Sequence, residues 1–140
     1  MSESNATKTL KKALRVYPKI HFQRFEDKLT PGIPDLNFCY LGKEFWLEGK
    51  HLKTLPARGS SRVRFGQKGE PRLAHQCHWL NARKDAGGRA FLWLRIDDAG
   101  WFVLNDGFRV LIDGLTKDAL LGRRNFKFAK DVVKYIIESN

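Results

Sequence analysis

Asp35, Glu48 and Lys50 have the residue types and spacing of a metal-dependent hydrolytic site. Two carboxylates suit Mg²⁺ or Mn²⁺, which prefer oxygen ligands and keep waters and substrate phosphate oxygens at their remaining positions. Such an ion polarises a phosphate and lowers the pKa of a bound water, and a nearby lysine stabilises the negative charge that develops. The simpler alternative is a solvent-exposed ion pair across two strands, worth about 0.2 to 1 kcal/mol.

A predicted β-hairpin brings these three residues together. Residues 35–41 and 44–50 alternate like strands, and Gly42-Lys43 between them suits a two-residue type II′ loop. In that register Asp35 faces Lys50. Because side chains two residues apart share a face, the three residues lie on one surface with Asn37 and Trp46. The opposite face is apolar and predicts a core layer of Leu36, Phe38, Tyr40, Phe45 and Leu47.

The remaining periodicity predicts a mixture of helices and strands in one domain, residues 1–140. A helix ends at Pro18, and a second helix runs from Pro71 to Ala86, where Gly87-Gly88 stops it. Further strands are expected at 21–25, 90–96 and 101–104. The tail from about 116 to 140 reads as a helical extension whose apolar face carries Phe128, Val132, Tyr135 and Ile136. The expected fold is α/β or α+β, a central mixed sheet of four to five strands flanked by helices.

Three motifs occur in a defined order: Gly32-Ile33-Pro34-Asp35, then an apolar strand ending in Glu48-Gly49-Lys50, then a helix carrying Gln76. This order resembles the PD-(D/E)xK nuclease superfamily, closest to VRR-NUC-type and small phage and bacterial Holliday-junction-resolvase-like nucleases. The resemblance implies a restriction-endonuclease-like core and a Mg²⁺-dependent (or Mn²⁺-dependent) DNA endonuclease. It implies metal ligation by Asp35, Glu48, the Gly49 carbonyl and Glu3, with Lys50 orienting the water and Gln76 supporting Lys50 or the substrate. Gly49 departs from the hydrophobic residue that is usual between the acid and the lysine.

Two of these assignments have plain alternatives. Glu3 also fits as an acidic first-turn residue favoured by the helix dipole. Gln76 falls on the same helical side as Trp79 and Arg83, which would equally make it a surface glutamine. His51 points to the core side of its strand and is expected to be structural.

The charge balance favours a polyanionic partner. Lys and Arg number 26 against 15 Asp and Glu, a net charge of +11. The segment 51–70 has no regular period, as expected of a functional or disordered loop. It holds five basic residues and no acid before Glu70, which favours contact with a nucleic-acid backbone over a merely solvated loop: Lys53, Arg58, Arg62, Arg64 and Lys68.

Composition argues against several other classes. No apolar run is long enough to span a bilayer, and the N-terminus lacks a signal-peptide core, so a cytoplasmic protein is expected, in a bacterial cell or a phage-infected host. Two cysteines, Cys39 and Cys77, exclude a disulfide scaffold. His75, Cys77 and His78 lack a second ligand pair, so the evidence for zinc is weak.

The resemblance further implies branched or double-stranded DNA as substrate and a homodimer. The rival from another class is a basic nucleic-acid-binding or inhibitory protein that keeps the fold without cleavage. Cleavage of RNA or single-stranded DNA is a third alternative.

Overall fold

A six-stranded mixed sheet forms the centre of the molecule. The structure is a computed structural model that describes residues 2–25 and 30–139. The strand order is β1-β2-β3-β5-β6-β8, and only the β3–β5 pair is parallel within the described sheet. The bounds are β1 (His21–Arg24), β2 (Leu36–Tyr40), β3 (Lys43–Leu52), β5 (Arg89–Ile96), β6 (Gly100–Leu104) and β8 (Asn125–Phe126).

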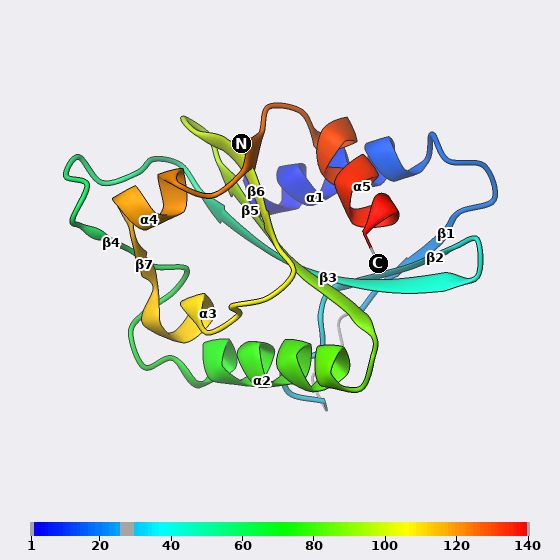
Figure 1. Cartoon of the computed structure of the whole chain (residues 1–140), viewed down its shortest axis with the longest axis horizontal. Helices are drawn as coiled ribbons and strands as arrows, with labels where there is room; N and C mark the ends of the chain where they lie inside the picture. The colour runs from blue at the N-terminus through cyan, green and yellow to red at the C-terminus, as the bar shows by residue number, and fades with distance from the viewer. Residues whose placement is uncertain (1, 26–29, 140) are drawn as a thin grey trace.

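Helices cover both faces of this sheet (Figure 1). On one side lie α1 (Glu3–Leu14) and α5 (Ala129–Glu138), and on the other lie α2 (Pro71–Asp85) and the short α3 (Val110–Asp113). The expected mixed α+β fold with a central sheet flanked by helices is confirmed. The described sheet has one strand more than the four to five expected, because β8 pairs with β6. None of the described helices has the length and apolar character needed to cross a membrane.

Two hydrophobic clusters divide the core between the two faces. Leu47 and Trp93 belong to the cluster that packs against α1 and α5. Leu92 and Leu94 belong to the cluster under α2. Because side chains alternate along a strand, the odd-numbered residues of β3 face α1 and α5, and the even-numbered ones, Glu48 and Lys50 included, face α2.

The β2–β3 hairpin differs from its predicted register by two residues. Tyr40 pairs with Lys43, so the loop is Leu41-Gly42 and not Gly42-Lys43. Leu41 and Gly42 have φ values of 51° and 78°, the positive pair that a type I′ turn requires. A shift by two leaves every side chain on its predicted face. It changes the partner of Asp35, however: one step beyond the Leu36–Leu47 pair, Asp35 lies opposite Glu48 and not Lys50.

The segment from about residue 116 onward is not the continuous helical extension that was expected. It contains α4 (Lys117–Leu121), the strand β8 and then α5. Phe128 precedes the first turn of α5 and is 52% exposed, whereas Val132 and Ile136 are fully buried as predicted. The prediction for Phe128 was wrong because the helix begins one residue after it.

The basic segment 51–70 is held against this C-terminal part of the chain. Its strand β4 (Arg62–Val63) pairs with β7 (Leu115–Thr116). The amides of Lys117 and Asp118 donate to the carbonyls of Ser61 and Gly59 at 2.9 and 3.0 Å. Val63 and Phe65 are buried in the cluster under α2. The segment is therefore a docked element and not the structureless loop that its sequence predicts.

Candidate active site

Glu48 and Lys50 lie on the same face of β3, beneath α2, and both are buried. The Lys50 Nζ is 3.8 Å from the Glu48 Oε1, and the two side chains are 7% and 6% exposed. Asp35 is half-buried directly before β2, across from Glu48. The alternative of a solvent-exposed ion pair is therefore wrong. Both charges are desolvated, a costly arrangement that natural proteins keep mainly for a specific use.

Burial and mutual repulsion raise the pKa values of both carboxyl groups. Burial first, then the negative charge of Glu3, raise the pKa of Asp35 to about 6, while Arg24 and Lys50 oppose this change. Burial and the negative charge of Asp35 raise the pKa of Glu48 to about 8 against the pull of Lys50. Two carboxyl groups this close titrate as a pair. At neutral pH the pair therefore retains about one proton unless a cation takes its place.

One oxygen of this pair, Asp35 Oδ1, and one oxygen on α2, Gln76 Oε1, are buried without a hydrogen-bond partner among the described residues. Gln76 is 7% exposed, so its interpretation as a surface glutamine is wrong. An unpaired buried oxygen costs about 1 to 3 kcal/mol, and such exceptions call for an explanation, a bound ion or water being one. The oxygens of Asp35 and Gln76 are thus suited to accept a ligand.

The donor set fits a hard divalent cation. Mg²⁺ would neutralise two carboxylates that lie close together and repel each other, and one of them has an unpaired oxygen. One or two carboxylates are enough for this ion, because it keeps several of its water ligands. Within the described ranges, however, no three His, Cys, Asp or Glu side chains lie close enough to hold a metal ion. Glu3 raises the pKa values of both acids but does not complete such a cluster with them. Its side chain is exposed in the first turn of α1, which Ser2 caps.

Gly32 explains why the turn before Asp35 and the helix α2 lie so close together. Its φ is +81°, and a Cβ at this position would lie 2.1 Å from the carbonyl oxygen of His75 and 2.8 Å from the amide nitrogen of Gln76. Only glycine permits that backbone contact and that conformation. The α2 backbone at His75 and Gln76 is therefore seated against the turn that leads into Asp35.

Gly49 has an equally specific reason. It pairs with Trp93 of β5, and a Cβ on Gly49 would lie 1.8 Å from Cζ2 of the Trp93 indole. The indole fills the space that a hydrophobic residue at position 49 would use. The departure from the usual Glu-x-Lys pattern is thus compensated by a tryptophan on the neighbouring strand.

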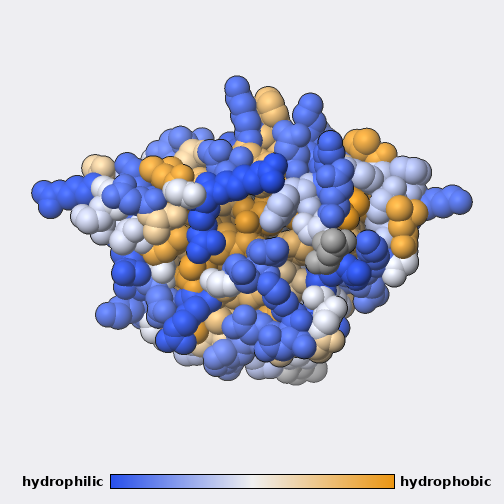
Figure 2. All heavy atoms as spheres, viewed as in Figure 1, coloured by the Kyte–Doolittle hydropathy of each residue, from blue (hydrophilic) through white to orange (hydrophobic). Residues whose placement is uncertain are grey.

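The five basic residues of segment 51–70 divide into two groups. Arg62 Nη1 donates to the carbonyl oxygens of Asp113 (3.2 Å) and Gly114 (3.4 Å), and Arg64 Nη1 donates to that of Asp113 (3.4 Å). These two arginines hold the segment in place. Exposed side chains make up the second group, Lys53, Arg58 and Lys68. Figure 2 shows hydrophilic side chains projecting from the end of the molecule where β4 and α4 lie.

The structure adds residues that sequence reasoning did not assign to the site. Arg24 of β1 aligns with Leu36, next to Asp35, and its positive charge acts on that carboxyl group. The only sequence signal for it was its place in a strand-like run that could pair with the hairpin. Trp46, on the Glu48 face as predicted, contacts Trp79 of α2 with ring centroids 5.0 Å apart. His51 has the structural role that was expected: its Nε2 lies 3.0 Å from Asp97 Oδ1, within hydrogen-bond distance.

The strand order and the helices on both faces define a resolvase-like fold of the restriction-endonuclease class. Among solved structures, the chain is similar in fold to the Holliday junction resolvase Hjc from the archaeal hyperthermophile Archaeoglobus fulgidus. The TM-score is 0.53 at 14% sequence identity, and the match covers 96% of this chain and 97% of the resolvase chain. No family model matches the sequence, and no curated protein matches it.

Proposed function

We propose that this chain is a divalent-metal-dependent DNA endonuclease of the PD-(D/E)xK type that acts on branched DNA. The observation that carries the proposal is the pair of half-buried Asp35 and buried Glu48, with the Lys50 Nζ 3.8 Å from the glutamate. Its resolvase-like fold supports the same assignment, and the net charge of +11 suits a DNA partner.

Each residue has a role that its surroundings suit. Asp35 and Glu48, with the Gly49 carbonyl, would hold Mg²⁺ or Mn²⁺, and Glu3 would add a more distant negative charge. When bound, the ion supplies Lewis-acid activation of the phosphate and of a water. The positively charged ammonium group of Lys50 can donate hydrogen bonds to a phosphate oxygen and to the attacking water. Gln76 presents an unpaired Oε1 that can accept a hydrogen bond from that water or from Lys50.

The test is a cleavage assay with four DNA forms: supercoiled, linear, single-stranded and four-way junction. We expect cleavage in Mg²⁺, its loss in EDTA, and the fastest reaction on the junction. Lys50→Ala is expected to bind DNA as well as the wild type and to cleave at least 100-fold more slowly, as for loss of a group that stabilises the transition state. Cleavage that persists in EDTA, or full activity of Lys50→Ala, would refute the mechanism.

The rival is a DNA-binding protein that has the fold but does not cleave. One observation favours it: among the described residues, no third carboxylate lies close enough to Asp35 and Glu48 to bind the same metal ion. Tight DNA binding by the wild type with no cleavage in either Mg²⁺ or Mn²⁺ would establish this rival.

A further inference from the structure

A group of aromatic and cationic side chains borders the candidate site on the α2 side of the sheet. Trp46 contacts Phe25, with ring centroids 5.3 Å apart, and also Trp79, at 5.0 Å. The guanidinium carbon of Arg83 lies 5.3 Å from the Trp46 ring centroid and 4.7 Å from that of Trp79. We call the three residues Trp46, Trp79 and Arg83 the stacking platform.

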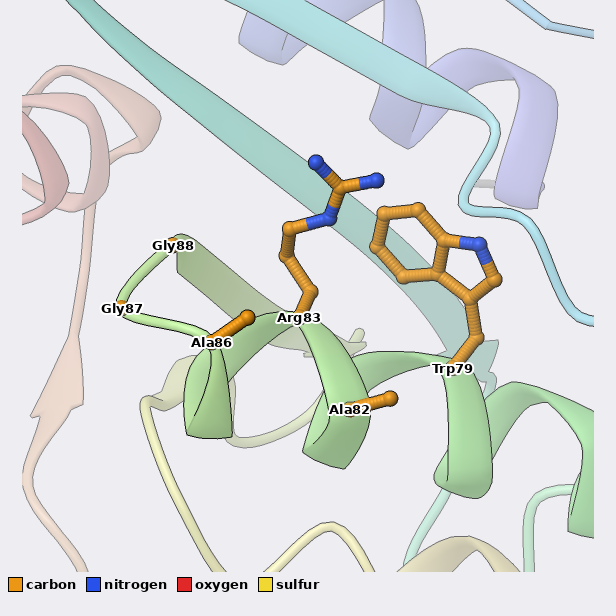
Figure 3. A pocket seen from close by; sticks show the side chains of 6 residues that line it. All are labelled: Trp79, Ala82, Arg83, Ala86, Gly87 and Gly88. Carbon is orange, nitrogen blue, oxygen red and sulfur yellow. The ribbon is translucent and has the colours of Figure 1, made fainter.

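The stacking platform is more accessible than the core tryptophans on the other face of the sheet. Trp46 and Trp79 are half-buried and Arg83 is exposed, whereas Trp93 and Trp101 are only 1% and 2% exposed. Figure 3 shows the Trp79 and Arg83 side chains rising side by side from α2, with the guanidinium group next to the indole. Part of each indole and the Arg83 cation are therefore open to solvent, although the indoles also contact each other and the guanidinium group.

A hollow of about 480 Å³ opens beside the stacking platform. Apart from Trp79 and Arg83 its walls are small residues: Ala82, Ala86, Gly87 and Gly88. A Cβ on Gly88 would lie 2.6 Å from Cδ and 2.8 Å from Cγ of Arg83, so glycine at this position lets the arginine stem lie across the end of the helix. The small side chains leave open a space with a planar cation and an indole at its edge.

The stacking platform is close enough to the candidate site to contact the same DNA strand. Trp46 lies two residues before Glu48 on the same strand face. Trp79 follows Gln76 by one helical turn, and Arg83 lies about 10 Å from Gln76 along the helix axis at ~1.5 Å per residue. A DNA strand covers that distance in about three base steps at ~3.4 Å each.

We propose that the stacking platform binds an unpaired nucleobase of the DNA strand whose phosphate lies at the Asp35–Glu48 site. Bases displaced from a duplex stack on aromatic rings and on arginine planes, and the two are combined here. The proposal rests on the proposed function and specifies its substrate as DNA with an unpaired base near the cleaved bond. Stacking does not depend on base identity, so little sequence preference follows.

The test compares two duplexes that differ only in the presence of one nucleobase. Both carry a one-nucleotide bulge, which is a thymine in one duplex and an abasic analogue in the other. Affinities are measured by fluorescence anisotropy in EDTA, so that cleavage plays no part. The wild type should bind the thymine bulge roughly 5- to 150-fold more tightly, the range that corresponds to one base–aromatic stack.

Variants separate stacking from charge and from folding. Trp79→Ala should bring this ratio close to one, and Trp79→Phe, which keeps a π face, should retain most of it. Lys84→Ala removes a neighbouring positive charge on α2 outside the stacking platform, and should weaken binding of both duplexes equally with the ratio unchanged. Thermal melting of each variant checks that it folds.

Cleavage of junction DNA in Mg²⁺, measured on the same preparations, distinguishes the two proposals. A ratio of one in a wild type that cleaves DNA would overturn the stacking proposal alone, as would a ratio that Trp79→Phe and Trp79→Ala both leave unchanged. A normal ratio without any cleavage would overturn the nuclease function and leave the base-binding site in place. A wild type that binds neither duplex would refute both.

Discussion

At the scale of single residues, the acidic pair is an unfavourable feature of the metal-free protein. Asp35 and Glu48 repel each other, and burial adds to the cost of their charged forms. Lys50 compensates only in part, since the pKa values of both acids stay raised. A site of this kind is stabilised by whatever cation binds to it, and it is set apart from ordinary surface acids by that property.

Metal affinity should therefore rise with pH. Bound protons compete with the metal, because carboxylates must be deprotonated to act as ligands. With pKa values of about 6 for Asp35 and about 8 for Glu48, the apparent affinity for Mn²⁺ is expected to increase between pH 6 and pH 8 and to level off above. Calorimetric titration of the DNA-free protein with Mn²⁺ at several pH values measures this. An affinity that is flat over this range would contradict the assigned ligands.

Glu48→Gln should stabilise the metal-free protein at alkaline pH. The pKa of Glu48 in the folded state is above its ordinary value, so between roughly pH 4.3 and pH 8 the folded state binds more protons than the unfolded state. The free energy of unfolding then falls as pH rises through this window, and above pH 8 the full cost of the charged group is present. Glutamine cannot ionise and avoids the cost.

Urea unfolding in EDTA at pH 5 and pH 8.5 measures the effect. We expect a gain of at least about 1 kcal/mol for Glu48→Gln at pH 8.5, the equivalent of less than one pKa unit, and a smaller gain at pH 5. The control is Glu44→Gln, an exposed acid on the same strand, which should change little at either pH. A loss of stability in Glu48→Gln that grows with pH would show that the ionised carboxylate is well compensated.

At the scale of elements, contacts between strands and helices decide where the chemical residues end up. The parallel β3–β5 pair places the Trp93 indole against Gly49, and the Gly32 turn fixes α2 over the site. Gly49 and Gly32 are therefore both required by the packing of neighbouring elements, and Gly32 seats the helix that carries Gln76.

Gly49→Ala is expected to destabilise the protein by about 1 to 3 kcal/mol, the usual cost of inserting a methyl group into a packed core. The added Cβ would lie 1.8 Å from the Trp93 ring, so β3 and β5 must separate or the indole must move. Gly122→Ala is the matched control, because it has a helical φ of −75° and its nearest neighbour would be at 3.5 Å. Thermal or urea unfolding compares the two. An equal effect of both substitutions would mean that the indole moves without cost.

Sequence reasoning predicted the elements of this fold better than their connections. Period-two alternation placed Asp35, Glu48 and Lys50 on one face, and that face survives a register shift of two because parity is conserved. The loop itself could not be predicted, since Leu41 with φ of 51° carries no glycine signal. The extra strand β8 is two residues long and leaves no periodicity to detect.

Burial of Gln76 and the docking of segment 51–70 were beyond reach for a different reason. Both depend on contacts between distant parts of the chain: Gly32 against the α2 backbone in the first case, and β4 against β7 in the second. The helical side that Gln76 shares with Trp79 and Arg83 faces the hairpin, but no local pattern states that. The role of Gln76 and of the other site residues stays a prediction for the assays above.

At the scale of the whole molecule, the C-terminal part of the chain serves to present the basic segment. Strand β7 and the start of α4 hold the segment around β4. Arg62 and Arg64 donate hydrogen bonds to the carbonyl oxygens of Asp113 and Gly114. The exposed cations of the segment then have a fixed place relative to the sheet. If the chain binds DNA as proposed, charge that is held in place in this way would contact the phosphates without the entropy cost of ordering a free loop.

The salt dependence of DNA binding should accordingly change most in a variant of the exposed basic residues. Each neutralised phosphate contributes a slope of about −0.9 to log affinity against log salt on duplex DNA. Replacing Lys53, Arg58 and Lys68 together by alanine is expected to make that slope shallower by up to about 2.7. The Arg62→Ala, Arg64→Ala pair should alter the slope less and lower the melting temperature more, because these side chains hold the fold.

A matched control separates local contact from net charge. The control replaces three other exposed lysines by alanine: Lys12, Lys130 and Lys134. It removes the same number of positive charges, but from α1 and α5, on the face of the sheet opposite α2. Anisotropy titrations of a duplex at several salt concentrations give the slopes. If the control variant flattens the slope as much as the basic-segment variant does, the +11 charge acts as a diffuse field. A selective effect of Lys53, Arg58 and Lys68 instead means that these residues touch the phosphates, because counterion release counts contacts and not the total charge of the protein.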